Sequence, residues 1–418
     1  MIKRIRNLLN RLNRSQDGRA LVSNAAYLFL LQVSGFIFPL LTIPYLARVI
    51  GVEGFGKIAF ASGVMIWLVT ISDWGFNYTA TRDVAKNKSN LEKVSEIFSN
   101  TLWARLLLMS ISLVILLILI AIVPYFRENS TILLVSFLMV PGNIFFPQWF
   151  FQALERMQFI TIFSLVSKVI FTVSVFVFIK DESDFILQPL FISLGNIVCG
   201  IAAMYVILRK WQFKLYHPNY QSIISTIKNS TDVFINNLMP NLYNSLGVVL
   251  LGFWWGSNAN GIYDAGKKLI SVVHSFMDII VRVTFPFLSR KIETHDLFAK
   301  LYISVSILLS LFVFIVSPTF IDLFFTEAFN ESLVVMRISS ISIFLLALSK
   351  VYGTNYLIIE GYEKTLRNIT IKCSLISFIA SLPLIYFYSY IGAAITLLLA
   401  QSLIGFSTAI KAIKIKGM

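Results

Sequence analysis

The feature that most constrains this chain is a series of apolar segments that recurs along its whole length. A helix needs about 20 largely apolar residues to cross the hydrocarbon core of a bilayer. We therefore predict an all-α membrane protein with twelve transmembrane helices. The predicted spans lie near residues 22–47, 57–80, 102–123, 131–151, 161–179, 187–208, 231–254, 261–285, 299–317, 333–358, 369–388 and 392–411.

The composition of the chain also indicates a membrane protein. Only 13% of its 418 residues are charged and 57% are hydrophobic, whereas a soluble domain carries about 25% charged residues. The pI near 9.7 would suggest nucleic-acid binding in a soluble protein. In a membrane protein basic residues mark the cytoplasmic side, so we expect no nucleic-acid partner.

The distribution of basic residues predicts the orientation. The N-terminus, the C-terminus and the loops on their side of the predicted spans carry 24 Lys and Arg. The opposite loops carry four, namely Arg48, Lys57, Arg127 and Lys180. By the positive-inside rule both termini are expected in the cytoplasm. Apolar residues at helical spacing within 1–20 predict a cytoplasmic amphipathic segment there.

Short motifs repeat between the two halves of the chain. "GVEGFG" (51–56) is followed 205 positions later by "GSNANG" (256–261), and "ALERM" (153–157) is echoed 208 positions later by "GYEKT" (361–365). We predict an N-terminal six-helix lobe (21–208), a cytoplasmic linker (209–228) and a C-terminal six-helix lobe (229–418). An even number of spans per half predicts a pseudo-twofold axis along the membrane normal, with a cavity between the lobes.

One predicted span carries many polar residues. At 100° per residue they share about 120° of the helical wheel. A charge at the bilayer centre costs about 2.5–3.5 kcal/mol on insertion scales, so this face is expected to line a wet lumen rather than contact lipid. Its members are Asp264, Lys267, Lys268, Ser271, His274, Ser275, Asp278 and Arg282.

Other predicted spans also contain polar residues. Asp73 lies in the second span, Lys168 in the fifth and Lys350 in the tenth, and Asn237, Asn241 and Asn244 follow helical spacing in the seventh. The cations outnumber the carboxylates, which favours an anionic cargo such as a phosphate, and the asparagines could bond sugar hydroxyls. Two alternatives stay open: Asp278 could pair with Arg282 at i, i+4, and Arg105 and Arg337 are expected to snorkel.

Motifs for other chemistry are weak. "GVEGFGKI" (51–58) and "GIYDAGKK" (261–268) fit GxxxxGK but lack the Ser or Thr that would hold magnesium. Neither the three histidines nor the two cysteines form a metal-binding pattern. We find no catalytic constellation, so we expect no enzyme activity, no cofactor and no metal.

Several stretches resemble a known family. They are "FPLLTIPYLARVIGVEGFGKIAFA" (38–61), "DWGFNYTATRDVAK" (73–86), "FFPQWFFQALERMQFIT" (145–161), "KVYGTNYLIIEGYEKT" (350–365) and "IGAAITLLLAQSLI" (391–404). From about residue 20 onward the chain resembles the bacterial O-antigen flippases, the Wzx-type polysaccharide transporters of the MOP superfamily.

The resemblance implies translocation of an undecaprenyl-pyrophosphate-linked oligosaccharide repeat unit across the inner membrane, from the cytoplasmic to the periplasmic leaflet, for lipopolysaccharide O-antigen synthesis. It implies a cationic lumen and alternating access. The matching stretches carry residues with implied roles in gating, coupling or loop packing. These are Arg48, Glu53, Gly54, Gly56, Asp73, Arg82 and Glu155.

Combining this resemblance with the helical wheel, we predict two groups of site residues. The expected lumen contacts are Lys168, Lys267, Lys268, Arg282, Lys350, Asn237, Asn241 and Asn244. The expected gating or coupling residues are Arg48, Asp73, Asp264 and Asp278.

Two other functions were weighed. A gradient-driven multidrug or small-molecule exporter could use the same plan, although an exporter of organic cations would need an acidic lumen. A membrane enzyme, such as a polymerase, would need a large loop or a catalytic domain that the chain lacks. Expected partners are the lipid-linked oligosaccharide, membrane lipids, an O-antigen polymerase, a chain-length regulator and a coupling ion, H⁺ or Na⁺.

Overall fold

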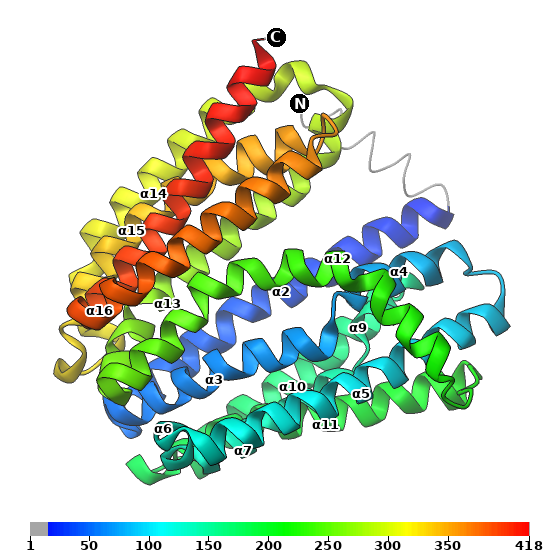
Figure 1. Ribbon diagram of the computed structural model, residues 1–418, viewed down its shortest axis with the longest axis horizontal. Coiled ribbons are helices and arrows are strands. Elements are labelled where there is room, and N and C mark those ends of the chain that lie inside the picture. Colours follow the sequence, from blue (N-terminus) through cyan, green and yellow to red (C-terminus); the bar gives the residue numbers. More distant parts are fainter. Residues whose placement is uncertain (1–15, 418) are drawn as a thin grey trace. The chain divides into compact units, whose positions relative to one another are not determined.

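The computed structural model describes residues 16–417, which are mostly helical and contain no β-strand (Figure 1). Among them are ten helices or helix groups that are long and apolar enough to cross a membrane. The chain is therefore a multi-pass all-α membrane protein, as its apolar segments predict. The predicted amphipathic pattern near the N-terminus falls mainly on residues 1–15, outside the described part.

Two of these ten segments are much longer than the rest. Residues 220–290 and 363–416 comprise 71 and 54 residues, whereas about 20 suffice to cross a bilayer. Each contains a residue with a non-helical backbone, Gly256 (φ 78°) in one and Ser389 (φ 51°) in the other. Both interruptions lie where the sequence predicted a boundary between spans. The count of twelve spans stays a prediction.

The described chain divides into two compact units. The first unit runs from the first described residue to Ile43 and includes 68–180 and 186–234. The second unit contains 44–67, 181–185 and the chain from Ile235 onward. The lobe boundaries predicted from the repeats remain predictions.

The first unit is built from short and long helices. It holds most of α2 (Gln16–Val49), the end of α3 (Gly51–Asp73) and the start of α12 (Tyr220–Asn244). Its other helices are α4 (Phe76–Lys86), α5 (Leu91–Ile122), α6 (Pro124–Glu128), α7 (Ser130–Phe137), α8 (Met139–Phe145), α9 (Gln148–Ala153), α10 (Met157–Phe178), α11 (Leu187–Tyr205) and the π-helix η2 (Val206–Lys210).

The segment predicted as an inter-lobe linker is fastened to α5. Its backbone amides at Lys214 and Tyr216 donate hydrogen bonds to Ser95 Oγ (3.1 Å) and Ser99 Oγ (2.9 Å). The two serines lie one turn apart on α5, so they match alternate residues of an extended strand. This part of the predicted linker is therefore an ordered extended segment that packs along α5.

The second unit contains the longest helices. It comprises the start of α3, most of the 3₁₀ helix η1 (Glu182–Ile186), the end of α12, and the helices that follow. These are α13 (Leu246–Arg290), η3 (Ile292–Thr294), α14 (His295–Phe324), η4 (Glu327–Phe329), α15 (Ser332–Leu348), the π-helix η5 (Ser349–Leu357) and α16 (Glu363–Lys416).

Helix α16 folds back on itself. Cys373 Sγ lies 3.8 Å from Ser407 Oγ, and Cys373 also shares an apolar cluster with Leu397 and Ala400. Residues on either side of Ser389 therefore pack antiparallel. Helix α13 packs against this hairpin, because Trp255 Nε1 donates a hydrogen bond to Ile385 O (2.9 Å).

The second repeated motif has the same turn in both units. Arg156 N bonds to Phe151 O (2.8 Å), and Tyr362 N bonds to Leu357 O (2.7 Å). This is the six-to-one bond of a Schellman helix end, with a left-handed residue just before the donor. That residue is Glu155 (φ 58°) in one half and Gly361 (φ 81°) in the other. The structure aligns them 206 positions apart, whereas the sequence motifs suggested 208.

Candidate functional site

The N-terminal part of the polar face of α13 is formed by two lysines and an aspartate. Asp264 and Lys268 form an ion pair of 2.6 Å, with each side chain about one-third exposed (29% and 32%). Lys268 Nζ also lies 5.3 Å from the ring centre of Phe55, and Lys267 Nζ lies 4.7 Å from that of Tyr263. Aromatic rings stabilise these ammonium groups without neutralising them.

The middle of the same face pairs with a distant helix. Asp278 Oδ1 lies 2.8 Å from Lys350 Nζ on η5, and both side chains are about 30% exposed (30% and 29%). His274 Nε2 lies 3.4 Å from Ser342 Oγ on α15. The alternative that Asp278 pairs with Arg282 is therefore wrong, because Lys350 takes that carboxylate. π-helical turns such as η5 occur frequently at functional sites.

Two cations on this face have no carboxylate partner within residues 16–417. Arg282 is exposed and Lys267 is partly buried, and neither forms an ion pair in the described structure. Fifteen helical residues separate them, which corresponds to about 22 Å along the axis. The face thus presents an uncompensated positive charge near each end and two neutralised lysines between them.

The predicted asparagines lie on the part of α12 that belongs to the second unit. Asn237, Asn241 and Asn244 are all partly buried. Asn244 and Gln401 are hydrogen-bonding neighbours of the Tyr243 hydroxyl. The structure therefore places these amides in a partly buried stretch of α12.

Lys168, in the first unit, has polar rather than ionic contacts. Its Nζ donates to Ser34 Oγ (2.9 Å) and to Leu31 O (3.4 Å) on α2. A Cβ at Gly35 would lie 3.7 Å from the same amine. These hydrogen bonds of Lys168 join α10 to α2.

Asp73 belongs to a buried ion pair in the first unit. Its Oδ1 accepts a hydrogen bond from Arg105 Nη2 at 2.7 Å, and the two side chains are 12% and 6% exposed. The expectation that Arg105 snorkels is therefore wrong. Ser72 and Ser112 hydroxyls lie 3.2 Å apart beside the pair. This arrangement fixes α5 against the end of α3.

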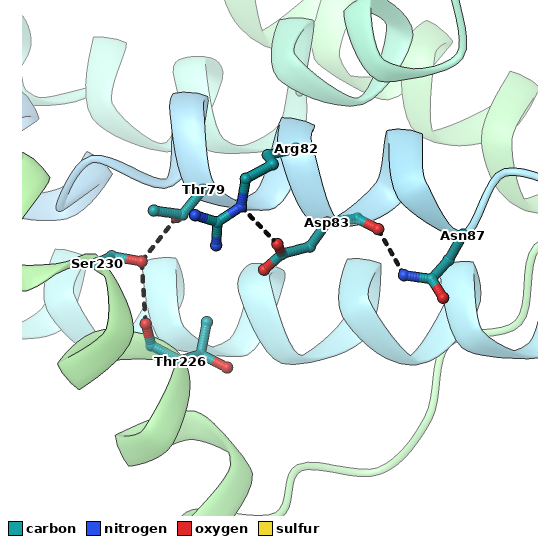
Figure 2. Close-up of polar contacts among 6 residues, drawn as sticks. All are labelled: Thr79, Arg82, Asp83, Asn87, Thr226 and Ser230. Carbon is teal, nitrogen blue, oxygen red and sulfur yellow. Dashed lines mark hydrogen bonds and ion pairs between the residues drawn. The ribbon is translucent and has the colours of Figure 1, made fainter. Parts of the chain in front are cut away.

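Helix α3 ends at Asp73. Trp74 (φ 44°) and Gly75 (φ 81°) adopt left-handed conformations, and the Trp74 ring stacks on Phe234 of α12 with centroids 3.8 Å apart. Figure 2 shows the neighbouring contact, in which Thr79 Oγ1 and Ser230 Oγ lie 2.7 Å apart. The second predicted span is therefore two helices, α3 and α4, fastened to α12.

The arginines at predicted gating or motif positions make local contacts. Arg48 Nη2 donates to Leu323 O (3.2 Å) near the end of α14, where a cation suits the negative end of the helix dipole. Arg82 Nε donates to Asp83 (2.9 Å), as Figure 2 shows. Arg337 lies 5.2 Å from the ring centre of Phe314.

The remaining residues of the family-like stretches make local contacts. Glu53 pairs with Lys57 at 2.7 Å, and Glu155 pairs with Lys88 at 3.1 Å. A Cβ at Gly54 would lie 3.1 Å from Ile50 Cβ, so little space is available there. Within the described residues no group of three or more His, Cys, Asp or Glu could hold a metal ion.

A sequence family with a fitting description covers most of this architecture. The model of the family described as "Polysaccharide biosynthesis protein" matches residues 21–292, which is more than half of the chain. The chain belongs to this polysaccharide biosynthesis family. The match includes the polar face of α13 and the buried Asp73–Arg105 pair, although family membership alone assigns no role to either.

Individual relatives agree with the family. The chain is 27% identical over 389 residues to a protein of Escherichia coli (strain K12) named "Putative O-antigen transporter", covering 91% of this chain and 94% of the relative. Its fold is similar to that of the lipid II flippase MurJ in an inward closed conformation (TM-score 0.69, 14% identity, 95% and 88% coverage). It is also similar to a MOP superfamily transporter from Pyrococcus furiosus (TM-score 0.65, 12% identity, 97% of both chains).

Sequence reasoning found the polar face of α13 but missed its partners. Helical periodicity identifies which residues of one helix share a face. It cannot identify Lys350, which is 72 positions away from Asp278, or Arg105 as the partner of Asp73. The sequence did indicate that partners must exist, because an isolated charge inside a membrane span needs an oppositely charged partner or water.

Proposed function

We propose that this member of the polysaccharide biosynthesis family is a flippase for undecaprenyl-pyrophosphate-linked O-antigen repeat units. It moves them from the cytoplasmic to the periplasmic leaflet of the bacterial inner membrane, with both termini in the cytoplasm. The observation that carries this proposal is the α13 face, on which Lys267 and Arg282 keep uncompensated positive charge in a membrane-spanning helix.

Physical cost supports a functional role for these charges. Ionised groups inside a membrane are expensive unless they face water, a partner or a charged cargo. Pyrophosphate oxygens form strong charge-assisted hydrogen bonds with Lys and Arg. Lys267 and Arg282 therefore suit the anionic part of a lipid-linked saccharide better than an organic cation, which they would repel.

The two paired lysines are further candidate ligands for the phosphate groups of the cargo. Lys268 and Lys350 each share a partly exposed ion pair with an aspartate. An incoming phosphate can compete with Asp264 or Asp278 for these ammonium groups, because a partly exposed ion pair contributes little net free energy to stability. In this proposal Asp264 and Asp278, together with Arg48, control the conformational cycle, and the two aspartates release Lys268 and Lys350 when cargo binds.

The neutral polar groups suit the saccharide part of the cargo. Sugar hydroxyls both donate and accept hydrogen bonds, and asparagine amides offer both functions. Asn237, Asn241 and Asn244 are partly buried on α12, and the Lys168 amine is a hydrogen-bond donor in the first unit. We assign these four side chains to the proposed pathway of the oligosaccharide.

Deleting the gene tests the cargo class. In a strain without a second flippase, long-chain surface polysaccharide should disappear, and undecaprenyl-linked repeat units should accumulate facing the cytoplasm. Reintroducing the wild-type gene should reverse both changes. Normal surface polysaccharide in the deletion strain would refute the proposal and favour the small-molecule exporter, whose loss leaves polysaccharide synthesis unchanged.

A further inference from the structure

The π-helix η5 contacts α13 through two polar side chains. Lys350 Nζ lies 2.8 Å from Asp278 Oδ1, and Asn355 Nδ2 donates a hydrogen bond to Thr284 Oγ1 (3.2 Å). Asn355 is fully buried (0% exposed), whereas the Lys350 side chain is 29% exposed. The lysine proposed to bind cargo and a buried amide therefore face the same neighbouring helix.

The π form of η5 accounts for this shared direction. Lys350 and Asn355 are five residues apart, so in an α-helix they would be about 140° apart around the axis. In a π-helix, whose hydrogen bonds join residues i and i+5, they lie on one side, a single turn apart. Ile358 N bonds to Gly353 O (3.1 Å), which is a bond of this type. Whatever keeps η5 in this uncommon form therefore sets the direction of Lys350.

A buried histidine of α14 bonds to the main chain of η5. His295 is 0% exposed, and its Nε2 lies 3.2 Å from the carbonyl oxygen of Val351, the residue after Lys350. Because a carbonyl oxygen only accepts, Nε2 carries the proton and donates it. The imidazole ring also packs against Tyr352 and Tyr356, with ring centres 5.8 and 5.0 Å away. His295 therefore contacts both the main chain and the side chains of η5.

The end of α16 fixes the orientation of the imidazole ring. His295 Nδ1 lies 3.4 Å from Lys416 Nζ. An ammonium group only donates, so Nδ1 is the unprotonated nitrogen. Lys416 is itself held by an ion pair with Asp296 and by the ring of Tyr356, whose centre lies 5.3 Å from Nζ. Both nitrogens of a neutral imidazole are thus occupied, and a flipped ring would lose both hydrogen bonds.

We propose that His295 is a positioning residue, which holds η5 in its π form and thereby directs Lys350 toward Asp278. Its Nε2–H satisfies a carbonyl group of the π-helix, and Lys416 keeps the ring turned toward that carbonyl. His295 is buried, so it acts through Lys350 rather than by contact with cargo. This inference rests on the proposed function, because it assumes that Lys350 takes part in transport.

Two polar substitutions separate the roles of the two ring nitrogens. His295→Gln keeps an N–H near the position of Nε2 and can still donate to Val351 O. His295→Asn keeps a polar group near Nδ1 but is too short to reach Val351 O. Hydrogen–deuterium exchange of peptide 349–357 in the detergent-purified protein should be near wild type for His295→Gln. It should be about tenfold faster for His295→Asn, the factor expected for one lost hydrogen bond.

Transport should follow the same order as exchange. In a flippase-null strain, His295→Gln should restore most of the surface polysaccharide, whereas His295→Asn should restore little of it at normal membrane levels. The π-helix η2 of the first unit is an internal control, and its exchange should be the same in all variants. The matched control variant is His217→Leu at an exposed position, which should equal wild type in both assays.

Each outcome decides the proposal. Equal exchange of η5 in the two His295 variants would overturn it, and so would full complementation by His295→Asn. If His295→Asn fails to reach the membrane, Lys416→Met decides, since it removes the partner of Nδ1. Wild-type exchange of η5 in that variant would overturn the proposal.

The same measurements separate this inference from the proposed cargo. Faster exchange of η5 in His295→Asn alone, together with normal polysaccharide in a deletion strain, would support the positioning of η5 and refute only the cargo. Loss of polysaccharide on deletion, with equal exchange in the two variants, would support the cargo and overturn the positioning role of His295.

Discussion

Two ion pairs of similar chemistry occupy different environments in this protein. Asp73 and Arg105 in the first unit are almost fully enclosed, with side chains 12% and 6% exposed. Asp278 and Lys350 in the second unit are 30% and 29% exposed. Breaking an enclosed pair leaves a buried charge without solvation. A partly exposed charge can instead bind water or another ion. We infer that the first pair is structural and the second is exchangeable.

Breaking the enclosed pair should have the largest effect on folding. Arg105→Gln leaves the Asp73 carboxylate buried and unpaired, which costs about 3–5 kcal/mol. We expect a large fall in membrane level and in the thermal unfolding temperature of the detergent-purified protein. The matched control is Asp73→Leu with Arg105→Met, which removes both charges and should restore much of the stability. Wild-type stability of Arg105→Gln alone would contradict the structural role.

Breaking the partly exposed Asp278–Lys350 pair should reduce transport more than stability. Asp278→Asn removes the partner of Lys350, whose side chain is 29% exposed, so the loss of stability should be about 1 kcal/mol. Surface polysaccharide should fall, because the carboxylate that releases the cargo from Lys350 is lost. The unfolding temperature and surface polysaccharide of the same variant separate the two effects. A stability loss as large as that of Arg105→Gln would remove the distinction between the pairs.

Charge rather than size should matter at Lys268. This lysine pairs with Asp264 and is 32% exposed, so its environment resembles that of Lys350. Lys268→Arg should keep much of the transport, whereas Lys268→Gln should lose most of it at unchanged membrane levels. The readout is complementation of a flippase-null strain, with a blot for each variant. Equal activity of the two variants would show that only packing matters there.

The most exposed of the ion pairs compared here should have the smallest effect. Lys93 and Glu96 lie 2.9 Å apart at the start of α5, with side chains 48% and 49% exposed. Glu96→Gln should cost about 0.3–0.5 kcal/mol, as for other exposed helix pairs, and should leave transport unchanged. The same two assays measure it. A loss of transport here would mean that charge removal at any position disturbs the protein.

The sequence was sufficient for what depends on local pattern. Spans follow from apolar length, the polar face of α13 follows from periodicity, and the interruption at Gly256 follows from a glycine motif. The break at Trp74 and Gly75 was missed, because a left-handed tryptophan is held by stacking on Phe234. Tertiary packing, which no single segment encodes, decides such features.

The same limit applies to the candidate site and the repeat. The repeated glycines Gly56 and Gly261 were visible in sequence, yet their close approach to Ser257 O and Val52 O depends on how α3 packs against α13. The partners of Asp73 and Asp278 depend on packing between distant helices. Pattern therefore identifies residues that need an explanation, and the structure shows which of them neutralise each other and which, such as Lys267 and Arg282, do not.

The most direct test of a cationic face that handles anionic cargo is the double variant Lys267→Gln with Lys268→Gln. It removes both charges from one end of the polar face of α13 and keeps a flexible polar side chain at each position. Surface polysaccharide in a flippase-null strain should be lost at normal membrane levels, with lipid-linked repeat units accumulating toward the cytoplasm. Wild-type surface polysaccharide from this double variant would contradict the account and show that the charged face of α13 is structural.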